Sequence, residues 1–98
     1  MSDKKEPTKA DVKPGTIPMF KVLLHNDDET TMGFVMAILI QIFRKDEQTA
    51  HKIMMEVHEK GVGLIVVEPY ERAEFHHDQV VSLARAQGFP LSVSIEAA

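Results

Sequence analysis

The chain has 98 residues, a formal net charge of −4 and no cysteine. The missing cysteines exclude disulfides, thiolate metal sites and cysteine nucleophiles. The net acidity argues against a nucleic-acid partner, because such a surface needs a basic stripe that displaces counterions. A chain of this length forms one small domain with a modest core and little room for a deep active-site cavity.

The sequence predicts neither a targeting signal nor a membrane-spanning segment. No segment approaches the ~20 apolar residues of a membrane span, and the first residues lack the apolar stretch of a signal peptide. We therefore expect no membrane association and a location in the cytoplasm. Residues 1–18 are polar, contain Pro7, Pro14 and Pro18, and show no apolar period. We interpret them as a disordered tail that precedes a folded domain over residues 19–98.

The folded part begins with a strand and a helix. Phe20, Val22 and Leu24 alternate with other residues, which predicts a strand with one buried face. Thr30 or Thr31 can cap the helix that follows. Apolar residues then recur at helical spacing, at Phe34, Val35, Ile38, Leu39, Ile42 and Phe43, and Met32, Met36 and Ile40 widen this stripe. The pattern predicts a helix that is buried almost all round and is closed by Arg44-Lys45.

Capping residues delimit two further helices. Asp46 is a suitable N-cap and Gly61 a suitable left-handed C-terminal residue for a second helix. Pro69 fits the first turn of a third helix, which Gly88 ends. The inner face predicted for this third helix consists of Ala73, His77, Val80, Val81 and Ala84.

The remaining apolar segments predict two more strands, one over 62–67 and one over 91–95. The resulting order, strand–helix–helix–strand–helix–strand, predicts an α+β domain. In it a three-stranded sheet has three helices packed on one face. The two strands on either side of the third helix could pair in parallel through a right-handed crossover.

Polar residues gather at the corner between the first strand and the first helix. Asn26, Asp27 and Asp28 follow the strand directly, and a strongly apolar helix comes next. Asn and Asp are common in ordinary turns, where their side chains bond the nearby backbone. Alternatively, acceptor groups beside an apolar surface could hold a cation that carries an apolar group, such as a peptide N-terminus. The spacing does not match a calcium loop.

Histidines and methionines each allow two interpretations. His58 can be a partly buried histidine satisfied by a neighbour, or a polar group that joins the Asn-Asp corner. His76 and His77 point about 100° apart on a helix, so they do not form a chelating pair. The methionines suit a core, and they also suit a binding surface that accepts several side chains. No recognised nucleophile, phosphate-binding or dinucleotide motif occurs, so nothing in the sequence argues for catalysis.

Four segments, in order and with matching spacing, resemble one known family over about residues 19–96. They are Phe20-Lys21-Val22-Leu23-Leu24-His25-Asn26-Asp27-Asp28, Thr30-Thr31-Met32-Gly33-Phe34-Val35, Met54-Met55-Glu56-Val57-His58-Glu59-Lys60-Gly61 and Pro90-Leu91. The chain resembles ClpS, the adaptor that brings proteins with an N-terminal degradation signal (an N-degron) to a Clp ATPase–protease.

The resemblance implies a recognition site and no cofactor, metal or catalytic residue. Asn26, Asp27 and His58 match the positions that hydrogen-bond the substrate's α-amino group, and Asp28 is implied as their support. The positions that match the wall of the first-residue pocket are Thr30, Met32, Val35, Met54, Val57 and Leu91. Met32 matches the gatekeeper that disfavours β-branched first residues.

Several positions depart from the family's usual residues. Glu29 stands where Tyr is frequent, Thr31 where Pro is usual and Gly33 where Glu is usual, and all three flank the expected pocket. In the stretch that helps to dock the ATPase, Glu71 matches a contact position. His76 replaces the usual Lys, which makes the identity of the ATPase partner an open question.

The expected function is that of a monomeric adaptor, not an enzyme. It would bind N-degron peptides that begin with Leu, Phe, Tyr or Trp, and deliver them to a Clp AAA+ unfoldase. Nucleic acid and membrane are not expected as partners. One alternative is a diverged binding module that has lost N-degron recognition. A second alternative is a small metal-dependent hydrolase that uses His58, Asp27 and Asp28.

Overall fold

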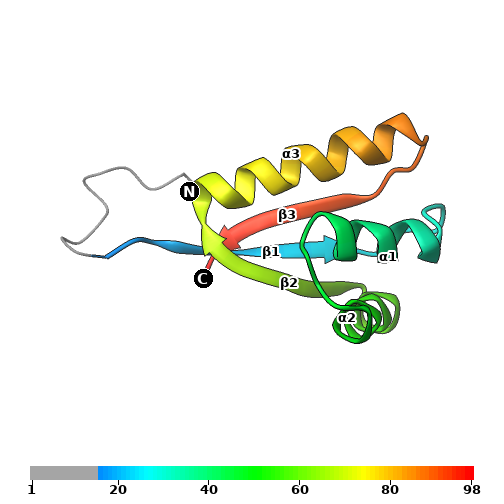
Figure 1. Ribbon diagram of the computed structural model, residues 1–98, viewed down its shortest axis with the longest axis horizontal. Helices are drawn as coiled ribbons and strands as arrows, with labels where there is room; N and C mark the ends of the chain where they lie inside the picture. The colour runs from blue at the N-terminus through cyan, green and yellow to red at the C-terminus, as the bar shows by residue number, and fades with distance from the viewer. Residues whose placement is uncertain (1–15) are drawn as a thin grey trace.

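The computed structural model describes residues 16–98, so most of the predicted tail over 1–18 lies outside the described residues. The elements are β1 (Met19–His25), α1 (Met32–Gln41), α2 (Glu47–Lys60), β2 (Val62–Pro69), α3 (Tyr70–Ala86) and β3 (Ser92–Ala97) (Figure 1). The predicted α+β order of strands and helices is confirmed.

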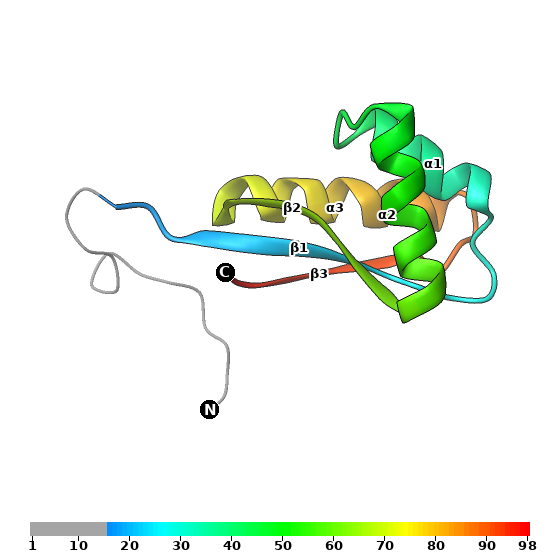
Figure 2. The same cartoon turned by 90° about the horizontal axis from the view of Figure 1, so that it is seen from below.

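The three strands form one antiparallel sheet in the order β2-β1-β3. Leu23 of β1 lies opposite Leu64 of β2 and opposite Ser94 of β3. The three helices lie on one side of this sheet, as predicted (Figure 2). The predicted parallel pairing of the strands around α3 is wrong. Because β1 lies between β2 and β3 and runs antiparallel to both, these two strands are parallel to each other but share no ladder.

The alternation of β1 builds the centre of the core. Phe20, Val22 and Leu24 are all buried on the helical side of the sheet. Side chains from every other element pack around them. The buried cluster consists of Val22, Leu24, Val35, Ile38, Leu39, Phe43, Ala50, Ile53, Met54, Val57, Ile65, Ala73, Val80, Ala84, Leu91 and Val93.

Local capping chemistry sets the helix boundaries near the site. Thr31 is the N-cap of α1, and its hydroxyl accepts a hydrogen bond from the Phe34 N–H at 3.2 Å. Asp46 caps α2 and accepts from the Thr49 N–H at 2.7 Å. Gly61 ends α2 with a φ of 88°, a left-handed conformation that favours glycine. These three caps are confirmed as predicted.

The first helix differs from the sequence expectation in length and burial. It ends at Gln41, before Arg44-Lys45, because the chain turns towards α2 and Arg44 adopts a φ of 59°. Its apolar residues do not all face the core. Val35, Ile38 and Leu39 are buried, whereas Met32 and Ile40 are exposed. Since α1 packs on the core along one stripe only, Met32 remains available at the surface.

Candidate functional site

A pocket of about 270 Å³ opens between the β1–α1 corner, the start of α1 and the C-terminal half of α2. Polar and apolar groups from segments far apart in the sequence meet there. The lining residues are Asn26, Asp27, Asp28, Thr30, Met32, Val35, Met54, Val57 and His58. The pocket therefore brings together the three residues expected at the α-amino group, the expected support, and five of the six expected wall residues.

Leu91 is the expected wall residue that does not line this pocket. Its side chain is only 2% exposed and belongs to the core cluster just before β3. It therefore contributes to the packing of the core. The alternation of apolar residues over 91–95 already indicated an inward-facing position, but it could not separate the core from a pocket wall.

The topology explains why the β1–α1 corner and the end of α2 are neighbours. The Asn26 N–H donates to the carbonyl of Gly61 at 3.0 Å, and the Gly61 N–H donates to the carbonyl of Val57 at 2.8 Å. His58 lies in the last turn of α2, one residue after Val57. The end of strand β1 is thus tied to the end of helix α2, which places Asn26 and His58 at the same pocket.

Asp27 organises the corner through its own carboxylate. Its Oδ1 accepts hydrogen bonds from the N–H groups of Glu29 at 2.8 Å and Thr30 at 2.7 Å. Its Oδ2 accepts from the Thr30 hydroxyl at 2.8 Å. A carboxylate offers about four acceptor sites, so these three bonds fix its orientation and leave acceptor capacity on Oδ2. The turn interpretation and the binding interpretation of this corner are therefore compatible.

The surroundings of Asp27 favour its charged form. Partial burial on its own would raise the pKa of this carboxyl. The hydrogen bonds from Thr30 and Glu29 outweigh it and, with the positive charge of Arg85, hold the pKa below the ordinary 3.8. The pocket therefore carries a fixed negative charge at neutral pH, beside apolar walls.

The side chains that line the pocket are buried in its interior and exposed at its mouth. Val35, Met54 and Val57 are buried and form the apolar interior. Met32 is 50% exposed and lies at the first position of α1, at the pocket mouth. Asn26, Asp28 and His58 are exposed polar residues on the same rim. This arrangement suits a ligand with a cationic end at the rim and an apolar end in the interior.

Arg85 contributes to the site, although its sequence context gave no indication of it. Its Nη1 donates to the carbonyls of Phe89 at 2.8 Å and Leu91 at 3.0 Å, which anchors the α3–β3 loop. The ring of Phe89 in that loop lies 5.1 Å from the ring of Phe34 in α1. Arg85 thus links α3, through the α3–β3 loop, to the helix that carries Met32 and Val35, and its positive charge helps to lower the pKa of Asp27.

The two residues expected at an ATPase contact lie on α3, away from the pocket lining, and have different environments. Glu71 is exposed in the first turn of α3. The side chain of His76 is only 12% exposed, and its Nδ1 lies 2.7 Å from Oε2 of Glu68. The His76 ring also packs 4.7 Å from the ring of Phe43. His76 rather than the predicted His77 is the more deeply packed histidine of α3, because Glu68 of β2 offers it a buried partner.

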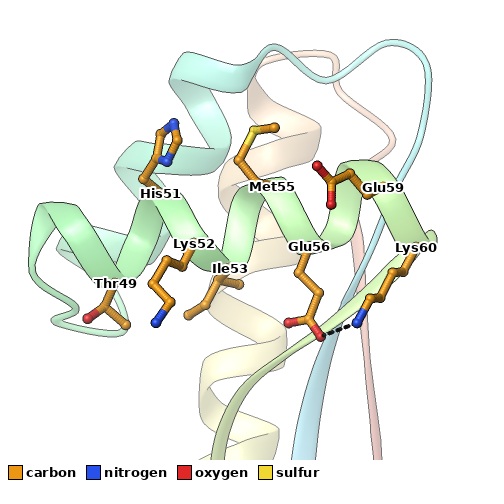
Figure 3. A pocket seen from close by; sticks show the side chains of 8 residues that line it. All are labelled: Thr49, His51, Lys52, Ile53, Met55, Glu56, Glu59 and Lys60. Carbon is orange, nitrogen blue, oxygen red and sulfur yellow. Dashed lines mark ion pairs between the residues drawn. The ribbon is translucent and has the colours of Figure 1, made fainter.

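A larger hollow, of about 510 Å³, lies along α2 and contains none of the expected site residues (Figure 3). All eight side chains that line it belong to α2. Two of them, Glu56 and Lys60, form an ion pair at 3.9 Å. Because only one helix contributes side chains, this hollow is an open groove. The smaller pocket is the better candidate site, because three segments of the chain converge on it.

Within residues 16–98, no three His, Cys, Asp or Glu side chains are grouped so that they could hold a metal ion. The arrangement that the metal-dependent hydrolase requires is therefore not found in this part of the chain. None of the helices described there is long and apolar enough to cross a membrane.

The comparisons with known proteins agree with one another. Residues 16–94 match the family model described as ATP-dependent Clp protease adaptor protein ClpS. A ClpS adapter from Oleidesulfovibrio alaskensis is 54% identical over 77 residues, which cover 79% of this chain and 74% of the relative. A ClpS adapter from Desulfatibacillum aliphaticivorans is 48% identical over 91 residues, which cover 93% of this chain and 85% of the relative.

A solved structure has the same fold. Agrobacterium tumefaciens ClpS2 bound to L-phenylalaninamide superimposes with a TM-score of 0.82 at 34% identity, covering 85% of this chain and all of the other. The relatives are named as adapter proteins rather than enzymes, in agreement with the sequence expectation. The family match spans nearly the whole described domain, so this chain belongs to the ClpS family of ATP-dependent Clp protease adaptor proteins.

Proposed function

We propose that the pocket binds the free N-terminus of polypeptides whose first residue is Leu, Phe, Tyr or Trp. The observation that carries this proposal is the composition of the pocket. A single cavity has a charged and polar rim formed by Asn26, Asp27 and His58, and an apolar interior formed by Val35, Met54 and Val57.

The polar rim suits an α-amino group. Such a group has a pKa of ~7.7–8.0, so it is mostly cationic at neutral pH, and it offers three donors. An Asn26 amide oxygen, the remaining acceptor capacity of Asp27 Oδ2 and a neutral nitrogen of His58 provide three acceptors. The hydrogen bonds from Thr30 and Glu29 keep Asp27 ionised and oriented before the ligand arrives.

The apolar interior suits the first side chain. Burying a Leu or Phe side chain there would contribute ~1.5–3 kcal/mol. The amine and the side chain are attached to the same carbon, so a ligand must present both at once to use both halves of the pocket. The ClpS2 relative is named as bound to L-phenylalaninamide, which carries a free α-amine and an aromatic side chain on one carbon.

We further propose that the protein acts as a cytoplasmic monomer that delivers the bound polypeptide to a Clp-family AAA+ unfoldase. The family name, Clp protease adaptor, supports the partner class. The exposed Glu71 in the first turn of α3 is proposed as one contact with the ATPase. For His76 we propose a smaller part in docking, because Glu68 and Phe43 enclose most of its side chain.

A titration with peptides that differ only in their first residue tests the recognition half. We expect Leu, Phe, Tyr and Trp peptides to bind and Ala, Ser and Glu peptides to bind at least about tenfold more weakly, a loss of 1.4 kcal/mol or more. Acetylation of the Leu peptide should abolish most of its affinity. The rival interpretation, a diverged module without N-degron recognition, predicts equal binding of acetylated and free peptides, and that result would reject the proposal.

A further inference from the structure

Gly63 lies directly behind the pocket, on the far side of one of its wall residues. It is buried in β2, where it pairs with Leu24 of β1. Unlike Gly61 and Gly88, it does not adopt a positive φ, so its backbone conformation does not require glycine. A glycine inside a strand loses packing and stability, and it often marks a place where another segment approaches closely.

The close approach at Gly63 is made by α2. A Cβ atom added to Gly63 would lie 2.7 Å from Cγ2 of Val57 and 3.4 Å from the carbonyl oxygen of Ile53. The first distance is shorter than real Cβ contacts allow, so Val57 would have to move. Val57 is β-branched and has few alternative rotamers in a helix. The backbone oxygen of Ile53 limits how far the helix can settle back towards β2.

Val57 also lines the pocket, so it lies between β2 and the space that a ligand would fill. We propose that Gly63 is a positioning residue that sets the width of the pocket. Without a side chain at Gly63, Val57 sits against the sheet, and the pocket stays wide enough for aromatic first residues. This inference rests on the proposed function, since it concerns the range of first side chains that the same pocket accepts.

The test is the substitution Gly63→Ala, measured with free peptides that begin with Trp, Phe or Leu. We expect Trp and Phe peptides to lose at least about fivefold in affinity relative to the Leu peptide. We set this lower limit below the tenfold that one methylene can cost inside a pocket, because the added methyl group acts on the ligand only indirectly, by displacing Val57. Thermal unfolding confirms that the variant is folded.

Gly33→Ala is the matched control. A Cβ at Gly33 meets nothing within 4 Å, and Gly33 does not line the pocket. We expect its Phe-to-Leu affinity ratio to stay within about twofold of the wild type, the usual limit of additivity. If folded Gly63→Ala also keeps the wild-type ratio, Gly63 serves packing alone and the proposal is overturned. A wild-type protein that binds none of the three peptides rejects the proposed function instead.

A double-mutant cycle identifies Val57 as the mediator and covers the case in which Gly63→Ala does not fold. In the Val57→Ala background the clashing methyl is gone. The double variant should therefore fold, and its Phe-to-Leu ratio should equal that of Val57→Ala. A double variant that fails to fold while Val57→Ala folds overturns the proposal. The proposal is also overturned if the Phe-to-Leu affinity ratio of the double variant differs by more than about twofold from that of Val57→Ala. The new Cβ at Gly63 would then act on something other than Val57.

Discussion

At the scale of single residues, Asp27 has a structural role and an electrostatic role, which a substitution can separate. Its carboxylate orders the β1–α1 corner through Glu29 and Thr30, and it supplies a negative charge to the pocket. An Asn side chain retains an oxygen that can accept the two backbone N–H groups, but it has no charge. Asp27→Asn therefore removes the charge with less damage to the corner than Asp27→Ala.

We expect Asp27→Asn to weaken binding of a free Leu peptide by about tenfold or more, since a hydrogen bond to a charged group contributes ~1.5–3 kcal/mol. Isothermal titration at neutral pH measures the change. Asp46→Asn, which makes the same replacement at the N-cap of α2 and outside the pocket lining, serves as the control and should leave affinity unchanged. Unchanged affinity in Asp27→Asn would show that the carboxylate only orders the corner.

Met32 offers a second test at the residue scale, because its half-exposed side chain lies at the pocket mouth. A β-branched first residue carries its bulk next to the amine, where Met32 would narrow the entrance, whereas Leu branches one atom further out. Met32→Ala should raise affinity for an Ile peptide by at least about threefold relative to a Leu peptide, since one methylene contributes ~1–3 kcal/mol in such pockets.

Two titrations, with Leu and Ile peptides, on wild type and Met32→Ala give this ratio directly. Ile40→Ala is a suitable control, because Ile40 is another exposed apolar residue of α1 that does not line the pocket. A Leu-to-Ile ratio that is the same in Met32→Ala and wild type would place the selectivity elsewhere.

At the scale of elements, α3 and the α3–β3 loop are anchored to α1, the helix that carries Met32 and Val35. Arg85 anchors the loop through the carbonyls of Phe89 and Leu91, and Phe89 packs on Phe34 of α1. Arg85→Met keeps much of the aliphatic stem but removes both hydrogen bonds and the charge. The elements most affected should be the α3–β3 loop and the adjacent first turns of α1.

We expect Arg85→Met to lower the free energy of unfolding by about 1–2 kcal/mol. Each kcal/mol corresponds to about 4–8 °C in the midpoint of thermal unfolding for a domain of this size. Differential scanning calorimetry measures the shift. Arg72→Met, at an exposed position of the same helix, should move the midpoint much less. Equal midpoints for both variants would mean that the Arg85 hydrogen bonds contribute nothing to stability.

At the scale of the whole molecule, stability should depend on pH through the carboxylates that hold the chain turns. The pKa values of Asp27 and Asp46 are both lowered from 3.8. Burial raises the pKa of Asp27, but hydrogen bonds from Thr30 and Glu29 outweigh this effect. The pKa of Asp46 is lowered chiefly by the backbone hydrogen bond from Thr49. A depressed folded-state pKa stabilises the native state above the unfolded value, and this stabilisation is lost as the pH falls through the folded value.

We therefore expect these two groups to contribute no pH dependence between about pH 5 and 7, and a progressive loss of stability below about pH 4.5. Urea unfolding followed at pH 6 and pH 3 measures the difference. The double variant Asp27→Asn/Asp46→Asn should show a smaller difference between the two pH values than the wild type. The same difference in both proteins would mean that other groups govern acid unfolding.

Delivery concerns the whole chain, including the residues before Thr16 that lie outside the described structure. Among the described residues, those that line the pocket begin at Asn26. We expect deletion of residues 1–17 to change peptide affinity by less than about twofold. The resemblance to ClpS implies that the ATPase engages such a tail during delivery, so the deletion should abolish stimulated degradation of N-degron substrates by the cognate Clp protease. Full-rate degradation with the truncated protein would show that the tail has no such role.

The sequence by itself determined the local structure and the chemical character of the site. Alternation at Phe20, Val22 and Leu24 specifies a strand, because successive side chains point to opposite faces. Capping residues such as Asp46 and Gly61 act over one turn, so their effect can be predicted without the fold. The family resemblance also predicts the set of residues around Asn26 and His58 that lines one pocket.

Only the tertiary structure decided which of these residues share a surface. β1 takes the central position between β2 and β3, so the expected parallel pairing does not form. Leu91 is buried in the core and is not among the residues that line the pocket, and Met32 is exposed although its helix is apolar almost all round. Arg85 donates hydrogen bonds to the α3–β3 loop, and its charge helps to lower the pKa of Asp27. Gly63 leaves room for the close approach of Val57. These outcomes depend on contacts between residues far apart in the chain, and the spacing of residue types does not encode such contacts.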